Sequence, residues 1–121
     1  MNRPVVAIVD DDARVLASLV ELLESAGYAT CSFLSGEALL AFGLQGVDVL
    51  ITDIGMPGAD GFELRDLARQ ANPELPVFLI TGRHEIADRP RPRGLGGFLR
   101  KPFDGDALLA AVRDVLDAGR S

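Results

Sequence analysis

The sequence predicts a single α/β domain spanning residues 1–121, built on a doubly wound, five-stranded parallel sheet with helices on both faces. Strand-like apolar runs alternate with helix-like segments along the whole chain of 121 residues. Most of these runs are nearly continuous and rich in β-branched residues, which is typical of strands covered on both faces. The chain shows no repeat, low-complexity segment or linker. Its number of strand–helix units suits an open sheet, because a closed barrel of this class needs eight.

The apolar runs define the expected strands. The first is VVAIV, and it ends where three consecutive aspartates begin. An open sheet of this class commonly has the flavodoxin-like strand order 2-1-3-4-5, which we adopt as the expected topology. The five expected strands are residues 5–9, 28–34, 47–52, 76–81 and 97–100.

Helices are expected after most of the strands. In the first, apolar residues from Val15 to Ala26 recur at steps of three and four, and Gly27 can end the helix. A residue whose side chain can accept a bond from the first helical N–H groups begins each of the other three. These expected caps are Ser35, Asp60 and Asp104.

The segment between the fourth and fifth strands departs from this pattern. It reads GRHEIADRPRPRGLGG, and Pro90 and Pro92 each remove a backbone donor and exclude the preceding residue from helical geometry. We therefore expect the fourth helix to be short, distorted or replaced by a loop. The segment is also rich in arginine, which fits either a solvated loop or an altered docking surface for an acidic partner.

Composition limits the function. Apolar residues make up 48% of the chain, charged residues 25%, and the formal net charge is −6. An acidic domain does not displace counterions from phosphates, so direct nucleic-acid binding is not expected, although a tethered DNA-binding domain is compatible. Cys31 is the only cysteine, and no apolar run approaches the ~18 residues of a membrane span. We expect a cytoplasmic protein without membrane contact.

Polar side chains follow four of the expected strands. Asp10 and Asp11 follow the first, Asp53 the third, Thr81 ends the fourth, and Lys101 follows the fifth. Parallel strands share one carboxyl edge, so these side chains are expected to meet there. Two carboxylates ~5 Å apart repel by roughly 3 kcal/mol, and a divalent cation such as Mg²⁺ reverses that cost. The set predicts a magnesium-dependent phosphoryl-transfer site with Asp53 as the nucleophile.

Each residue alone has a structural explanation. Asp12 is better explained as a helix cap than as a metal ligand. Asp53, taken alone after a strand, is typical of a turn residue. Lys101 is the single lysine of the chain, which a genome that favours arginine codons would also explain. Their joint placement at the strand ends favours the functional interpretation.

The motifs VDDD, LITDIGMPGADGFEL, LITG and KPF occur in this order, and with them the whole chain resembles the receiver domain of bacterial two-component response regulators. The resemblance implies a CheY-like fold and a cytoplasmic signalling role. It also implies phosphorylation of Asp53 by a phosphohistidine kinase, with Mg²⁺ required.

By matching position, the resemblance implies that Asp11 and Asp53 bind the metal directly and that Asp10 acts mostly through water. The main-chain carbonyl of Gly55 would complete the protein ligands. Gly55 also leaves no side chain over the site, where members of this family often place one that tunes the phosphate lifetime.

The resemblance also assigns the switch. Lys101 would contact the phosphoryl group, and Thr81 would shift toward it and report phosphorylation. Phe98 stands where the family keeps an aromatic rotamer switch, and as phenylalanine it would signal by packing alone. Such a domain is not an enzyme in the usual sense, because it catalyses only its own phosphorylation and dephosphorylation.

The implied partners are a sensor histidine kinase or a phosphotransfer protein, and a downstream protein or a fused output domain. The oligomeric state stays open. Two other functions are also open. One is a receiver-like interaction module that takes little phosphate. The other is a Mg²⁺-dependent aspartyl phosphatase that uses Asp10 and Asp12, although the hydroxyl residue of that enzyme class is replaced here by Arg14.

Overall fold

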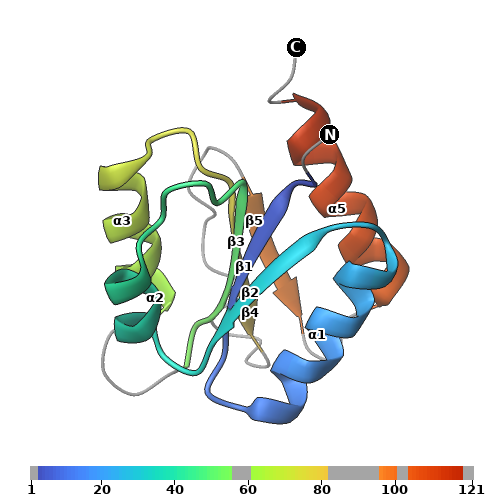
Figure 1. Cartoon of the computed structure of the whole chain (residues 1–121), viewed down its shortest axis with the longest axis horizontal. Helices are drawn as coiled ribbons and strands as arrows, with labels where there is room; N and C mark the ends of the chain where they lie inside the picture. Colours follow the sequence, from blue (N-terminus) through green and yellow to red (C-terminus); the bar gives the residue numbers. More distant parts are fainter. Residues whose placement is uncertain (1–2, 56–60, 82–95, 101–103, 119–121) are drawn as a thin grey trace.

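The computed structural model describes residues 3–55, 61–81, 96–100 and 104–118. Its five strands are all parallel and lie in the order β2-β1-β3-β4-β5, so the predicted sheet and its topology are confirmed (Figure 1). The strands are β1 (Val5–Val9), β2 (Ala29–Phe33), β3 (Val49–Asp53), β4 (Val77–Thr81) and β5 (Gly96–Arg100).

Helices cover both faces of the sheet. One face carries α1 (Ala13–Ser25) and α5 (Gly105–Ala118), and the opposite face carries α2 (Gly36–Phe42) and α3 (Gly61–Ala71) (Figure 1). The segment expected to form a fourth helix, with Pro90 and Pro92, lies outside the described residues.

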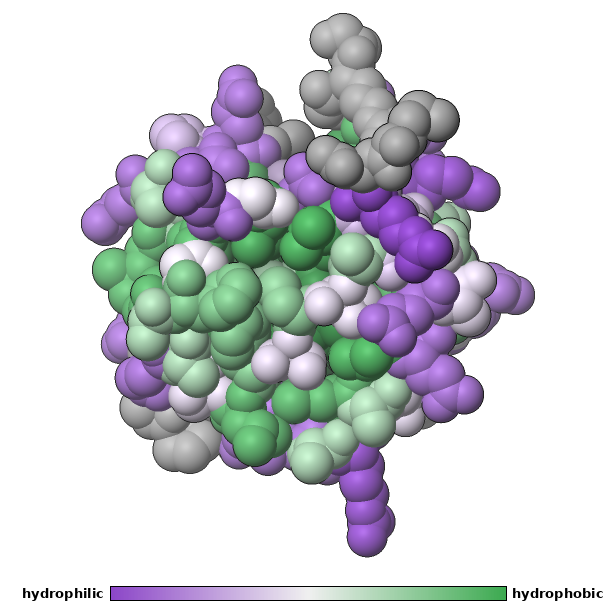
Figure 2. Space-filling model, viewed as in Figure 1, coloured by the Kyte–Doolittle hydropathy of each residue, from purple (hydrophilic) through white to green (hydrophobic). Residues whose placement is uncertain are grey.

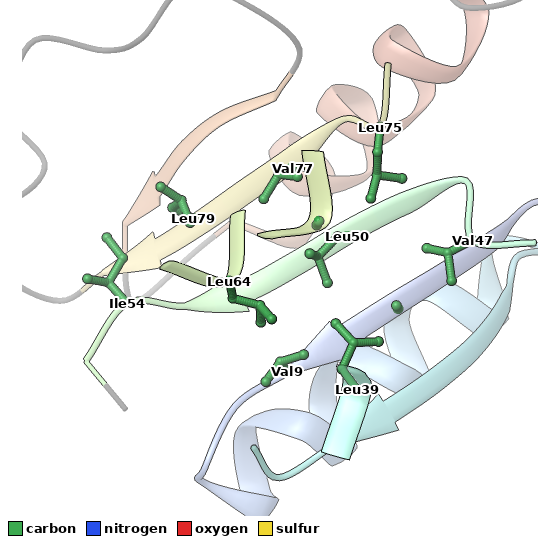
Figure 3. Close-up of a cluster of buried hydrophobic side chains, with 11 residues drawn as sticks. Val9, Leu39, Val47, Leu50, Ile54, Leu64, Leu75, Val77 and Leu79 are labelled. Atoms are coloured by element: carbon green, nitrogen blue, oxygen red, sulfur yellow. The ribbon is translucent and has the colours of Figure 1, made fainter. Parts of the chain in front are cut away.

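Two apolar cores fill the space between the sheet and its helices. In β1, Val6 and Ile8 point to the side of α1 and α5, while Ala7 and Val9 point to the side of α2 and α3. The strand is continuously apolar because both of its faces are buried. Figure 3 shows the core on the second side, where labelled side chains from the sheet, α2, α3 and the connecting segments meet: Val9, Leu39, Val47, Leu50, Ile54, Leu64, Leu75, Val77 and Leu79.

The helix ends follow the predicted signals. Ser35 Oγ accepts a hydrogen bond from the Ala38 N–H at 3.1 Å, and Asp104 Oδ1 accepts one from the Asp106 N–H at 2.9 Å. Gly27 follows α1 with φ of 96°, a left-handed conformation in which a glycine carries no steric penalty. These three predictions are confirmed, and Asp60 lies outside the described residues.

The third strand begins and ends later than expected. Its predicted range was 47–52, but the Val47 N–H donates to the Leu44 carbonyl at 3.1 Å, so Val47 belongs to the turn after α2. The strand then runs to Asp53, which pairs in register with Ile80 of β4. Asp53 is therefore held by the sheet itself rather than by a loop.

Two remaining features are the lengths of the helices and the environment of the single cysteine. Within the described ranges, no helix combines the length and the apolar character needed to cross a membrane. Cys31 is half-buried and packs against the core on the side of α2 and α3. Burial raises the pKa of its thiol above the ordinary value.

Candidate metal centre

Asp53 enters the site from the last position of β3. Only 9% of its surface is exposed. The next residue, Ile54, donates its N–H to the Ile80 carbonyl at 3.1 Å, so the ladder to β4 continues past the carboxylate. Behind it, the fully buried Thr52 donates its hydroxyl to the Asp53 carbonyl at 3.2 Å. The backbone that carries the carboxylate is thus fixed on both sides.

Asp10 enters from the end of β1, the strand next to β3. It is fully buried, and its N–H donates to the Phe33 carbonyl of β2 at 3.1 Å. Its Oδ1 accepts a hydrogen bond from the Asp12 N–H at 2.9 Å, which sets the turn between β1 and α1. This turn presents Asp11 to solvent beside the buried Asp10.

Asp12 has a different role from its two neighbours. Its Oδ1 accepts a hydrogen bond from the Arg14 N–H at 2.9 Å, and its extended backbone makes it the N-cap of α1. The prediction of Asp12 as a helix cap is confirmed.

The strand order brings three carboxylates together. One oxygen each from Asp10, Asp11 and Asp53 can be chosen so that all lie within 4.8 Å of one another. At that separation two carboxylates repel by about 3 kcal/mol at an effective dielectric near 20, so the cluster favours a cation. Hard oxygen donors in this number suit Mg²⁺, which takes one or two carboxylates and keeps the rest of its shell for water and phosphate. The donor set therefore fits the predicted ion.

Gly55 lies two residues beyond Asp53 and is exposed. Among the described residues, a Cβ built at this position would meet no atom within 4 Å. Its role as a main-chain metal ligand stays a prediction.

The structure describes the other predicted site residues only in part. Thr81 is the last residue of β4 and pairs with Arg100, and Phe98 of β5 pairs with Leu79. Both backbones belong to the ordered sheet, and Thr81 ends its strand on the same edge as Asp53. The side chains of Thr81 and Phe98, and the whole of Lys101, lie outside the described part of the chain.

Gly61 belongs to the surroundings of the site, and its role was missed in the sequence. It is the first residue of α3, and its N–H donates to the Ile54 carbonyl at 3.2 Å. A Cβ at this position would lie 2.6 Å from the Asp53 carbonyl oxygen and 2.9 Å from the Ile54 Cα, so only glycine fits without a shift. The signal in the sequence that could have identified this constraint is a glycine at the first position of a strongly periodic helix.

Comparison with known proteins agrees with this geometry. The family model described as the response regulator receiver domain matches residues 6–113. Among solved structures, the chemotaxis protein CheY4 of Vibrio cholerae superposes with a TM-score of 0.83 at 28% identity, covering 94% of this chain and 99% of that one. The response regulator StyR superposes with a TM-score of 0.83 at 32% identity, covering 96% of this chain and 60% of that one.

Curated relatives are longer proteins. The DNA-binding transcriptional regulator NtrC of Salmonella typhimurium is 37% identical over 115 residues, which is 93% of this chain and 24% of the relative. The transcriptional regulatory protein FixJ of Azorhizobium caulinodans is 38% identical over 120 residues, which is 96% of this chain and 56% of the relative. This chain thus spans about a quarter to about half of the curated relatives it matches. It belongs to the response regulator receiver domain family of two-component systems.

Proposed function

We propose that this domain, residues 1–121, accepts a phosphoryl group on Asp53 from the phosphohistidine of a sensor histidine kinase or a phosphotransfer protein. The observation that carries the proposal is the convergence of Asp10, Asp11 and Asp53 within 4.8 Å at the carboxyl edge of a parallel sheet. The cluster combines a nearly buried carboxylate with two others that can share a cation.

The chemistry needs an in-line attack by an Asp53 oxygen on the phosphorus. The new O–P bond forms as the P–N bond of the phosphohistidine breaks, and the departing imidazole nitrogen keeps the electron pair and takes up a proton. Bound Mg²⁺ would supply positive charge that offsets the negative charge of the phosphoryl oxygens. Asp10, Asp11, Asp53 and the carbonyl of Gly55 would hold it. The sheet contacts of Asp53 keep the nucleophile oriented.

The response would pass through residues of the neighbouring strands. In this proposal Lys101 contacts the phosphoryl group, Thr81 moves toward it, and Phe98 repacks. Phosphorylation then biases a two-state equilibrium that a partner reads. The domain catalyses only its own phosphorylation and dephosphorylation, acts in the cytoplasm, and makes no contact with membrane.

The expected partners of the domain are inferred from its net charge and from the greater length of its relatives. With a formal net charge of −6, the domain itself is not expected to bind nucleic acid. NtrC is described as DNA-binding, and this chain matches about a quarter of it. The output is therefore expected to reside in a fused domain or a separate downstream protein.

The structure argues against the phosphatase alternative. That mechanism needs the carboxylate of Asp12 beside the nucleophile Asp10, but Asp12 caps α1 through the Arg14 N–H. The remaining alternative is an interaction module that takes little phosphate.

Phosphate labelling tests the proposal. The wild-type chain is incubated with acetyl phosphate and Mg²⁺ and its intact mass is measured. We expect the mass of one phosphoryl group to be added and located on Asp53 by peptide mapping. Asp53→Asn should abolish labelling and Asp114→Asn, a matched change on the exposed side of α5, should preserve it. A phosphate on Asp10 would support the phosphatase, and no labelling at all would support the interaction module.

A further inference from the structure

An apolar patch lies beside the free edge of the sheet and includes none of the three clustered carboxylates. Leu34, Leu40 and Phe42 are exposed at 57%, 38% and 66%, and we call these three residues the α2 patch. The ring of Phe42 packs against that of Phe33 with centroids 5.3 Å apart, which joins the patch to β2. Figure 2 shows apolar residues gathered over α2 and the adjoining part of β2.

The grouping of these side chains is what requires an explanation. A single exposed leucine is normal on a protein surface, and Leu67 of α3, exposed at 42%, is of that kind. A contiguous group with an exposed aromatic ring is characteristic of an interaction site. Aromatic side chains are also over-represented among the residues that supply most of the binding energy in interfaces.

Strand β2 offers backbone groups next to this patch. The Ala29 N–H donates to the Pro4 carbonyl at 2.9 Å, and the Phe33 carbonyl accepts from the Asp10 N–H at 3.1 Å, so these residues face β1. By alternation, the backbone groups of Thr30 and Ser32 face away from the sheet. In the part of the chain that the structure describes, no strand pairs with that side of β2.

The segments that form the patch carry acidic but no basic side chains. The sequence contains no lysine or arginine between Arg14 and Arg65. Exposed acidic residues flank the patch on both sides of the edge strand. Glu37 lies in the first turn of α2, and the Glu24 carboxylate accepts a hydrogen bond from the Thr30 hydroxyl at 2.9 Å.

We propose that the α2 patch and the outer edge of β2 bind a segment of another protein that combines apolar side chains with lysine or arginine. The apolar residues of that segment would cover Leu34, Leu40 and Phe42, and its cations would meet Glu24 and Glu37. A second copy of this chain is a poor occupant, because a two-fold contact would bring the same acidic residues together. The surface contains none of the three clustered carboxylates, so this proposal goes beyond the proposed function.

An unbiased selection tests the chemistry of the partner. Short random peptides displayed on phage are selected on the unphosphorylated wild-type chain, with counter-selection on Phe42→Ser. We expect the enriched peptides to contain apolar residues together with lysine or arginine. Enrichment of acidic peptides, or no enrichment, would overturn the proposal.

Binding measurements locate the surface. The enriched peptide, labelled for fluorescence anisotropy, should lose about tenfold or more in affinity for Phe42→Ser and for Leu34→Ser. Circular dichroism checks that both variants are folded. Leu67→Ser makes the same type of change at an exposed leucine outside the patch and should leave the affinity unchanged. Rising ionic strength should weaken binding.

Two results would refute the placement. One is an equal loss of affinity in Leu67→Ser. The other is a wild-type dimer in analytical ultracentrifugation that Phe42→Ser abolishes, because the occupant would then be a second copy. Neither result bears on Asp53 labelling, so failure here is distinguishable from failure of the phosphoacceptor proposal.

Discussion

Replacing Gly61 with alanine should strain the backbone that carries the proposed phosphoacceptor. The added Cβ would lie 2.6 Å from the Asp53 carbonyl oxygen and 2.9 Å from the Ile54 Cα. Both neighbours are backbone atoms, so no flexible side chain can move aside. Ordinary contact begins near 3.4 Å, and the start of α3 must therefore move away from the end of β3 by about 0.8 Å.

The size of the effect follows from two opposing terms. Overpacking of a tight contact costs about 1–3 kcal/mol, and alanine recovers up to ~1 kcal/mol of helix propensity relative to glycine. The first position of a helix gains little of that propensity, so we expect Gly61→Ala to lower the free energy of unfolding by about 1–2 kcal/mol. For a domain of this size the melting temperature should fall by about 4–8 °C.

Urea denaturation followed by far-ultraviolet circular dichroism measures this loss, with thermal melts as a second readout. Gly55→Ala is the matched control, because its Cβ would meet no atom of the described residues within 4 Å, and the same type of change should alter stability by less than about 0.5 kcal/mol. If Gly61→Ala is as stable as the wild type, or if the two variants lose the same amount, the close contact is not the constraint described.

Further predictions address the acidic cluster, the strand ends, the thiol and a helix cap. Asp53→Asn in the presence of a chelator should raise the free energy of unfolding by about 1–3 kcal/mol, since it removes repulsion among close carboxylates, and chemical denaturation measures it. Asp48→Ala removes the acceptor of a 2.8 Å bond from the Val5 N–H and should cost about 1 kcal/mol in the same assay. The raised pKa of the Cys31 thiol stabilises the folded state at pH values below the pKa of the unfolded thiol. This contribution to the free energy of unfolding is lost as the pH rises through the pKa of the folded thiol. Alkylation by iodoacetamide, measured by mass spectrometry, should be slower for the native chain than for the unfolded chain. Ser35→Ala should cost about 1 kcal/mol by removing the N-cap bond of α2, as read from thermal melts, whereas Ser35→Asp should retain most of it.

The fold was largely predictable because its determinants are local. Continuous apolar runs such as VVAIV mark strands covered on both faces, and Ser35, Gly27 and Asp104 mark helix ends by their own backbone chemistry. The strand order was adopted from the fold class rather than calculated, and the structure confirms it.

The grouping of the carboxylates followed from that topology. Once β1 and β3 are neighbours, Asp10, Asp11 and Asp53 must share an edge, and the structure brings them within 4.8 Å. The proposed metal ligation, and the proposed roles of Lys101, Thr81 and Phe98, depend on side-chain positions that strand ends do not determine. Gly61 was missed because its constraint is a contact between two backbones, and residue periodicity carries no information about such a contact.

The hydrogen bond from the Gly61 N–H to the Ile54 carbonyl, at 3.2 Å, has a consequence for engineering. It ties together the two ends of the intervening stretch, whose stems are anchored to the sheet and to α3. A change in the length of that stretch would carry only a modest entropic penalty, about 0.6 kcal/mol for each doubling. The stretch therefore suits library construction, in which residues beside the proposed phosphoacceptor are varied while the strand and the helix that flank them stay constant.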